Sequence, residues 1–521
     1  MMLPRMLAGV LSLALLSACT TMQLAGDPLK TQPDANSGTV VLSLTLNTSQ
    51  VGQMQDIELS RDEDQTPGLS TRYQLFNAVP GISRDTALFV GILPAGTYRF
   101  SQIGSRDKYL AVNDRQRELV GGFRVEAGKT VDLGRLVLTA ANFKVVFGRS
   151  KLVPDNRRLV EAVAPAYRPL YLAPLSRGWL ADNPADMVES YARGRPQGAG
   201  GFSELADHRV IGGSRLGSVI ERDPDGRWRL LANTGGLDAV LSTAPYQDAA
   251  HMALAVGELG TFFKVRKDGG LDAVDRGNLP VGNYFFIDGA PDGKRWFVGV
   301  QLKGKGALYE SERLDGGDWK LVSEDTTEFS FWSGLRGVWI WRYAGGVGYA
   351  STASRQVACF DYATGRWRRN GTPEGRGLLY LAGGPTPAIG VLTQAGGGLA
   401  GVFAKTHYTK DCGANWTETQ SPYTVKVSAP LILPSGRILE SGGVFGDAGI
   451  YRSEDGKAWT KISADFRLFG ENVSVLPTVG LISVSNGAFG VEDVRHSDDD
   501  GANWQVEATS YDFRLAEKQK R

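Results

Sequence analysis

The sequence predicts an all-β protein in which an N-terminal β-sandwich is followed by a seven-bladed β-propeller. Three observations support this prediction. A turn motif rich in Asp and Gly recurs between residues 201 and 510, each copy ends in a Trp or Leu anchor, and successive anchors are 43 to 49 residues apart. A repeat of this length with strand and turn chemistry is typical of propeller blades.

The turn motif is clearest near the C-terminus. Residues 409–416 and 497–504 fit the pattern Ser/Thr-x-Asp-x-Gly-x-x-Trp, and residues 453–459 form a copy that is one residue shorter. In a tight turn the Asp carboxylate accepts hydrogen bonds from backbone amides, and the Gly adopts a φ that other residues resist. The Trp is expected to cover the turn and to pack on neighbouring strands.

This motif resembles the Asp-box, or bacterial neuraminidase repeat, of β-propellers. The resemblance implies a structural turn between the last two strands of a blade, on its outer rim. Such a turn is a folding device and does not indicate catalysis. The residues to which it assigns this role are Thr409, Asp411, Gly413, Trp416, Ser453, Asp455, Trp459, Ser497, Asp499, Gly501 and Trp504.

Looser copies upstream complete the repeat. Residues 223–228, 315–319 and 361–367 each place Asp and Gly before a Trp, and Leu271 follows Asp-Gly-Gly in the remaining interval. The anchors are Trp228, Leu271, Trp319, Trp367, Trp416, Trp459 and Trp504. Seven anchors predict seven blades. The strands of the third blade are expected over residues 284–287, 294–302, 307–312 and 318–322.

Composition sets the broad class of the chain. With 521 residues, of which 42% are hydrophobic and 22% charged, it can bury more than one core. The formal charge is +1, and it falls to 0 when residues 1–18 are removed, because Arg5 is the charged residue among them. No nucleic-acid partner is expected, since such proteins carry a strong basic excess.

The N-terminus has the features of a targeting segment. Arg5 precedes an apolar stretch over residues 7–16 that is too short to span a bilayer. The following Leu-Ser-Ala-Cys resembles a bacterial lipobox, which implies a signal peptide over residues 1–18 and acylation of Cys19. Thr20 after the cysteine implies sorting to the outer membrane, and several acyl chains make a firm anchor. An ordinary secretory signal with an incidental Cys is the alternative.

The region between this anchor and the propeller is expected to have three parts. Residues 19–36, rich in Gly, Pro, Asp and Gln, are expected to form a flexible tether, and residues 37–150 a β-sandwich. Residues 151–200 are interpreted as a connecting segment with a short helix capped by Asn183 and opened by Pro184. The propeller then spans residues 201–510, and residues 511–521 form a C-terminal tail.

Within the sandwich, residues 91–100 and 123–133 resemble transthyretin-like, or prealbumin-like, modules. Pro94 and Gly96 are expected to turn the chain, and Tyr98 and Phe100 to face the same side. Residues 128–129 are expected at the tip of a hairpin. Modules of this kind mostly act as spacers or docking units.

Two cysteines remain after Cys19, and their state stays open. Cys359 and Cys412 precede neighbouring anchors, so adjacent blades can bring them together, and an exported protein can form disulfides. Two free, buried thiols are the alternative.

Residues for catalysis or metal binding are not evident. The Asp-box family that this motif resembles includes sialidases, but the Arg-Ile-Pro segment expected in a sialidase does not occur in this sequence. The four histidines are far apart and lack metal-ligand spacing. In the acidic run at residues 498–500, a calcium site is the alternative to a structural turn, but calcium needs several spaced oxygen ligands and the turn already uses Asp499. No catalytic residue, metal or cofactor is expected.

The densest aromatic segment, residues 329–343, is the candidate binding region. Strand alternation places Trp339, Trp341 and Tyr343 on one face, where packing between blades is the expected role. The alternative is a platform for a partner, because exposed Trp and Arg are common anchors. The candidate binding residues are Trp332, Arg336, Trp341 and Arg342.

These features predict a lipid-anchored, non-catalytic binding or assembly protein of a Gram-negative envelope. Its partner is expected to be a protein or a glycan that contacts the loop face of the propeller, and the side of the outer membrane it occupies stays open. A glycan-active hydrolase or lyase of the sialidase-like propeller type is the alternative function.

Overall fold

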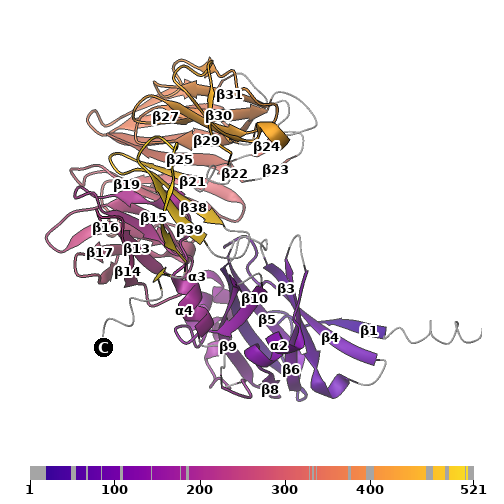
Figure 1. Ribbon diagram of the computed structural model, residues 1–521. Coiled ribbons are helices and arrows are strands. Elements are labelled where there is room, and N and C mark those ends of the chain that lie inside the picture. The colour runs from indigo at the N-terminus through magenta and orange to yellow at the C-terminus, as the bar shows by residue number, and fades with distance from the viewer. Residues whose placement is uncertain are drawn as a thin grey trace, which may run out of the picture. The chain divides into compact units, whose positions relative to one another are not determined.

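The protein, described from a computed structural model, divides into two units (Figure 1). The first comprises residues 1–80 and 84–190, and the second comprises residues 81–83 and 191–521. The structure describes residues 19–47, 54–65, 69–83, 85–105, 109–141, 144–176, 178–182, 187–327, 329–330, 334–335, 337–373, 377–394, 404–426, 428–464, 473–486, 492–510 and 512–513. Within these ranges, no helix has the length and apolarity needed to cross a membrane.

The first unit is a β-sandwich. One sheet contains, in spatial order, β1 (Cys19–Leu24), β4 (Leu69–Phe76), β3 (Met54–Arg61), β6 (Gly96–Ser105) and β7 (Tyr109–Ala111), with β8 (Phe123–Val125) also paired to β6. The other contains β10 (Lys144–Arg149), β9 (Thr130–Ala141), β2 (Ser37–Asn47) and β5 (Thr86–Pro94). Short helices η1 (Asp62–Asp64) and α2 (Asp114–Val120) lie in its connections. Inward side chains of both sheets form one hydrophobic core.

Aromatic side chains of β6 and β8 lie at the centre of this core. Tyr98 and Phe100 are both fully buried, as expected for residues on one face of a strand. The Tyr98 ring stacks on Phe123 with 5.7 Å between centroids, and its hydroxyl donates to the Pro94 carbonyl at 2.7 Å. The prediction for these two residues is therefore confirmed, and the hydroxyl holds the turn between β5 and β6.

The turn at residues 127–129 differs from the prediction of a hairpin. The strands on either side of it, β8 and β9, do not pair with each other: β8 pairs with β6 and β9 pairs with β2. The turn therefore passes from one sheet to the other. Spacing and turn residues alone cannot distinguish these two arrangements.

The prediction of a flexible tether over residues 19–36 is wrong for its first part. Residues from Cys19 to Leu24 form β1, which pairs in parallel with β4 along its whole length. Beyond β1, Gly26 forms a bridge to Ile92 of the other sheet. The edge of β4 offers unpaired backbone groups, and this segment satisfies them.

Much of the expected connecting segment packs on the sandwich. It contains α3 (Arg157–Val163), η2 (Pro165–Tyr171) and α4 (Met187–Arg193). Trp179 bridges to Phe123, packs on the sandwich core and donates from its ring nitrogen to the Leu133 carbonyl at 3.1 Å. The expected helix exists as α4, whereas Asn183 and Pro184 lie outside the described residues.

The second unit is a seven-bladed β-propeller, as predicted. Its seven antiparallel sheets each contain four strands that are consecutive in the chain. The strands are β11 (Ser203–Glu204), β12 (Val210–Gly213), β13 (Ser218–Arg222), β14 (Trp228–Asn233); β15 (Val240–Pro245), β16 (His251–Gly257), β17 (Phe262–Arg266), β18 (Leu271–Ala273); β19 (Asn283–Gly289), β20 (Trp296–Leu302), β21 (Lys305–Ser311), β22 (Lys320–Thr326); β25 (Val338–Tyr343), β26 (Gly346–Ser351), β27 (Gln356–Asp361), β28 (Arg366–Gly371); β29 (Leu378–Gly383), β30 (Ile389–Gln394), β31 (Ala404–Thr409), β32 (Thr417–Glu418); β33 (Leu431–Ile432), β34 (Ile438–Gly442), β35 (Gly449–Ser453), β36 (Thr460–Ser463); and β37 (Val473–Leu476), β38 (Gly480–Asn486), β39 (Glu492–Ser497), β40 (Gln505–Thr509).

The repeat positions correspond to the blades. Every anchor lies at the start of the fourth strand of its sheet: Trp228 and Leu271 begin β14 and β18, and Trp416 directly precedes β32. The four strands expected for the third blade overlap β19 to β22. A small sheet of β23 (Phe329–Ser330) and β24 (Gly334–Leu335) lies between the third and fourth blades in the chain. The short helix η3 (Ala199–Gly201) precedes the first blade, whereas η4 (Glu258–Gly260) connects β16 to β17 and η5 (Phe445–Asp447) connects β34 to β35.

The hydrophobic core of the propeller lies between its blades. Each pair of successive sheets shares a cluster of buried side chains; for example, Ile211 of the first blade and Val240 of the second belong to one cluster. The last cluster joins the ends of the chain, because it contains Phe202 and Ile220 of the first blade and Ile482 of the seventh. The ring is therefore closed.

Side chains close the ring between the seventh and first blades. The buried Arg195 guanidinium donates to the equally buried Glu492 carboxylate, with one Nε–Oε2 distance of 2.7 Å. Arg222 of the first blade donates to Glu507 at 2.6 and 2.8 Å, and the Trp228 ring nitrogen donates to the same carboxylate at 2.9 Å. We call these the closure contacts.

A disulfide joins the fourth and fifth blades. Cys359 lies in β27 and Cys412 in the turn after β31, and their Cα atoms are 6.2 Å apart. The sequence left open whether these two cysteines form a disulfide or remain free thiols, and the structure shows a disulfide across a blade interface. Both residues are fully buried within the hydrophobic cluster shared by these blades.

Replacing Glu492 with Gln is expected to destabilise the propeller by roughly 3–5 kcal/mol, because the buried Arg195 loses the charge of a buried carboxylate partner. The neighbouring change Asp493→Asn is the control. Asp493 pairs with Arg495, and both side chains are more exposed than those of Arg195 and Glu492, so the expected cost is below about 1 kcal/mol. Scanning calorimetry of both variants measures the difference. Equal melting temperatures for the two variants would contradict the role of the closure contacts.

Replacing Cys359 and Cys412 together with Ala is expected to cost roughly 2–4 kcal/mol, because the disulfide closes a loop with a sequence separation of 53 residues. Urea unfolding of the propeller checks this value. Treating the native protein with a reductant should produce the same loss, and the double variant should then be insensitive to reductant. A reductant effect in the variant would show that another bond is responsible.

Candidate functional site

A cavity of about 480 Å³ lies on the axis of the propeller. Its wall is formed by residues in or next to the first strand of each of the seven sheets. One such residue per blade, in chain order, is Ser203, Ser242, Phe286, Ile340, Leu381, Leu431 and Val475. The volume is within the range of pockets that bind small ligands or a few side chains.

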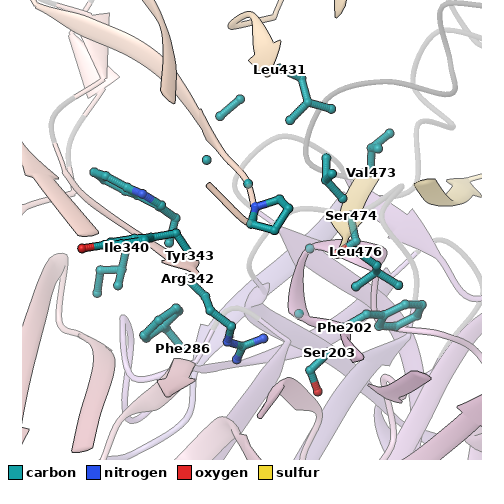
Figure 2. Close-up of a pocket in the computed structure, with 18 of the residues that line it drawn as sticks. Phe202, Ser203, Phe286, Ile340, Arg342, Tyr343, Leu431, Val473, Ser474 and Leu476 are labelled. Carbon is teal, nitrogen blue, oxygen red and sulfur yellow. The ribbon is translucent and has the colours of Figure 1, made fainter. Parts of the chain in front are cut away.

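The wall of this axial cavity is mainly apolar. Figure 2 shows Phe286 and Ile340 on one side, and Phe202, Val473 and Leu476 on the other. Backbone from glycine-rich segments such as residues 382–385 completes the surface. Among the described lining residues, Glu204 and Arg342 are the two with charged side chains, and both are engaged in other contacts.

Arg342 ties three blades together beside the cavity. Its Nε donates to Asp288 Oδ1 at 2.8 Å, and its Nη2 donates to the carbonyl oxygens of Thr243 and Ile287 at 2.7 and 2.8 Å. The other oxygen of Asp288 accepts from the Tyr362 hydroxyl at 2.8 Å. Burial raises the pKa of the Asp288 carboxyl, and the bonds from Arg342 and Tyr362 oppose this shift.

Glu204 links the first blade to the seventh. Its side chain is 5% exposed and accepts from the Thr478 amide at 2.9 Å, from the Thr478 hydroxyl and from the Val479 amide at 3.3 Å. Burial opposes ionisation, but these bonds and the contact with His208 hold the pKa of Glu204 below its usual value. Glu204 is therefore a structural anion that belongs with the closure contacts.

An arc of partly exposed aromatic side chains lies on one side of the cavity. Phe285, Trp339 and Tyr380 come from the first strands of three consecutive blades, and all three line the cavity. Each lies in the first half of its strand. Because propeller blades repeat about an axis, the first halves of these strands open toward the same end of the cavity. We call these three residues the aromatic arc.

The candidate binding residues lie in different surroundings. Trp341 and Arg342 line the cavity, but Trp341 is only 5% exposed, and its ring lies against Gly348 and Gly383. A side chain at either glycine would collide with the ring. Trp332 and Arg336 lie outside the described residues.

Strand alternation in β25 follows the prediction. Trp339, Trp341 and Tyr343 pack toward the fifth blade, whereas Val338 and Ile340 pack toward the third. The expected role of this segment in packing between blades is confirmed for Trp341 and Tyr343. Phe285 and Tyr380 were not among the predicted binding residues, although their position within the first strand of a recognised blade was a signal in the sequence.

The turn at residues 409–416 has the hydrogen bonds that its pattern predicts. Asp411 accepts from the Thr409 hydroxyl at 2.7 Å and from the backbone and side-chain nitrogens of Asn415 at 2.9 and 2.7 Å. The Gly413 amide donates to the Thr409 hydroxyl at 3.0 Å, and the φ of Gly413 is 83°. The Trp416 ring nitrogen donates to the Gly371 carbonyl at 2.9 Å, in the neighbouring blade.

The other two turns repeat this arrangement. Asp499 accepts from Ser497 and from the Asn503 amide at 2.9 and 2.8 Å. Asp455 accepts from two successive amides, and Ser453 takes the place of Ser497. The indoles of Trp459 and Trp504 donate to the carbonyl oxygens of Gly456 and Gly501 within their own turns. All three turns connect the third and fourth strands, away from the axial cavity.

His208, His251 and His496 have hydrogen-bonded protein partners. His251 lies between the carboxylates of Asp248 and Asp272 at 2.8 Å from each, and these contacts raise its pKa. His407 is buried in β31 with a lowered pKa, and the His496 ring contacts the Val479 carbonyl. Within the described part of the chain, no cluster of three His, Cys, Asp or Glu residues could hold a metal ion.

No family model matches this chain, and no curated protein matches its sequence. Among similar solved structures, a puromycin-hydrolyzing peptidase of Mycobacterium tuberculosis is 12% identical with a TM-score of 0.42. The match covers 63% of this chain and 55% of the peptidase. The Dos1 propeller is 12% identical with a TM-score of 0.34, and the match covers 58% of this chain and 83% of Dos1. At this similarity, function must be argued from the site.

The described wall of the cavity lacks the carboxylate pair that glycoside hydrolysis uses. Glycoside hydrolysis requires two carboxyl groups about 5–10 Å apart across the bond that is cleaved. The described wall of the cavity presents one carboxylate, Glu204, which is already bonded to the seventh blade. An apolar cavity with a few polar groups is instead suited to apolar parts of a ligand.

Replacing Asp411 with Asn is expected to cost about 1 kcal/mol at neutral pH, as for other carboxylates that bind backbone amides. Bonds from Thr409 and Asn415 lower the pKa of Asp411 to about 2, below its unfolded value of 3.8. The native carboxylate therefore stabilises the fold above pH 4, and this stabilisation is lost between about pH 4 and pH 2.

Unfolding of the native protein and of the Asp411→Asn variant at several pH values checks this expectation. The difference between their free energies of unfolding should shrink as the pH falls toward 2. The exposed residue beside the last turn provides the control Asp498→Asn, for which little change is expected. A difference that persists unchanged below pH 2 would contradict the argument.

Proposed function

We propose that this protein is a lipid-anchored, non-catalytic binding platform of the bacterial envelope, and that the axial cavity and its aromatic arc hold an apolar segment of a protein partner. The anchor is the acylated Cys19, implied by the lipobox and by Thr20 after it. The partner enters at the end of the cavity where the aromatic arc lies.

The observation that supports this proposal is the pairing of the cavity's charges. Arg342 and Glu204 are fixed by contacts with other blades, so the surface available to a ligand is mainly apolar and aromatic. Aromatic side chains are the usual anchors of protein interfaces. A glycan would need several free hydrogen-bonding groups for its hydroxyls, and the two charged side chains of this wall are already bonded to other blades. A protein segment is therefore the favoured ligand.

The test compares capture of envelope proteins by the full-length protein and by two variants. Tyr380→Ala, combined with Phe285→Ala, removes two members of the aromatic arc. Leu321→Ala is the control, since Leu321 is a large, exposed hydrophobic side chain like Tyr380 but lies on the outer strand β22. The captured partner should bind the variant that lacks Phe285 and Tyr380 at least about tenfold more weakly than the native protein. Its affinity for the Leu321→Ala control should be unchanged.

The same proteins are applied to a glycan array and to a panel of glycosides. Binding of a glycan that depends on Tyr380 would replace the protein partner with a saccharide. Hydrolysis of any glycoside by the native protein would overturn the non-catalytic role. The anchor is tested separately by the mass of the N-terminal peptide and by Cys19→Ala, which should release the protein from the membrane fraction.

A further inference from the structure

The edge strand β1 begins at the residue that the lipobox marks for acylation. Cys19 is paired with Leu69 of β4, so the sheet starts without an intervening linker. Figure 1 shows β1 next to β4 at the end of the sandwich sheet. At about 3.3 Å per residue, Leu24 is roughly 17 Å from Cys19. Any bilayer that holds acyl chains at Cys19 is therefore within reach of this strand.

Exposed apolar side chains gather on one face of this edge. Leu24 is 68% exposed, Phe76 52% and Met22 43%. In the parallel register Met22 lies beside Arg72 and Leu24 beside Gln74, and residues paired in this way share a face. Phe76 follows Gln74 by two residues and is on that face too.

The face in question is the outer one, turned away from the sandwich core. The intervening residues Tyr73 and Leu75 point inward and are buried in the hydrophobic core. We call Met22, Leu24 and Phe76 the apolar edge. Its polar neighbour Arg72 is paired with Glu58 at 3.0 Å, so no uncompensated charge at this position opposes contact with lipid.

We propose that the apolar edge rests in the interfacial layer of the bilayer to which Cys19 is anchored. This inference depends on the acylation of Cys19 in the proposed function. Acyl chains hold the start of β1 at the membrane surface, and the rigid strand then carries Met22 and Leu24 along that surface. Apolar side chains of a surface-bound segment enter the boundary between headgroups and acyl chains.

A bilayer fits this edge better than a second protein does. Stable protein interfaces use about 20–30 residues on each side, whereas the apolar edge has three large apolar side chains. A small apolar patch beside a lipid anchor contributes a second contact that fixes orientation. The sandwich is therefore seated on the membrane by its edge, and is not suspended from it by a flexible tether.

The test uses the acylated full-length protein in vesicles of phosphatidylethanolamine and phosphatidylglycerol. The variants Leu24→Cys and Phe76→Cys place a thiol on the apolar edge, and Gln23→Cys places one on the opposite face of β1. Gln23 is also exposed, which makes it a matched control. The other thiols are unavailable, because Cys359 and Cys412 form a disulfide and Cys19 carries lipid.

Each thiol is labelled with an environment-sensitive dye, and quenching by lipids with a spin label near the headgroup is measured. Quenching at positions 24 and 76 is expected to exceed that at position 23 roughly threefold. Equal quenching at positions 23 and 24 in acylated protein would overturn the inference and leave the anchor intact. A mass that shows Cys19 without lipid would overturn the anchor and the inference together. Unchanged melting temperatures of the labelled proteins exclude misfolding.

Discussion

The propeller depends on the junction between its seventh and first blades. Each sheet is built from consecutive strands, so the described strands of the seventh sheet all follow the sixth in the chain. Arg195 and Arg222 bind carboxylates of the seventh blade, and a shared hydrophobic cluster fills the space between the two sheets. Breaking this junction would leave two blades with an exposed apolar face each.

Closure also determines the character of the axial cavity. Once seven first strands surround one axis, polar side chains there must find partners or remain in an apolar enclosure. Arg342 and Glu204 both reach neighbouring blades, and these contacts brace the ring. The surface left for a ligand is then mainly apolar, with serine side chains and backbone groups among the aromatic and aliphatic residues. The same contacts that hold the blades together thus occupy the two charged side chains of the cavity.

Sequence reasoning succeeded where the constraint is local. The turn of residues 409–416 needs a carboxylate, a glycine with positive φ and an indole at fixed offsets, and these offsets are visible in one chain. It failed where the structure depends on contact with a segment far away in the same chain. Cys19 to Leu24 were expected to belong to a flexible tether because residues 19–36 are rich in Gly, Pro, Asp and Gln, but the free edge of β4 recruits the start of this segment into a sheet. Likewise, the turn at residues 127–129 joins two sheets because of where β6 and β2 lie.

By itself, the sequence determined the number of blades, the position of the fourth strand in each, the chemistry of the turns and the alternation of β25. All of these follow from spacing along the chain, which sets which side chains share a strand face or a turn. Tertiary structure alone decided the Cys359–Cys412 bond, the engagement of Arg342, the aromatic arc and the apolar edge at β1. These depend on contacts between residues far apart in the chain, and no local pattern records which distant segment will supply the partner.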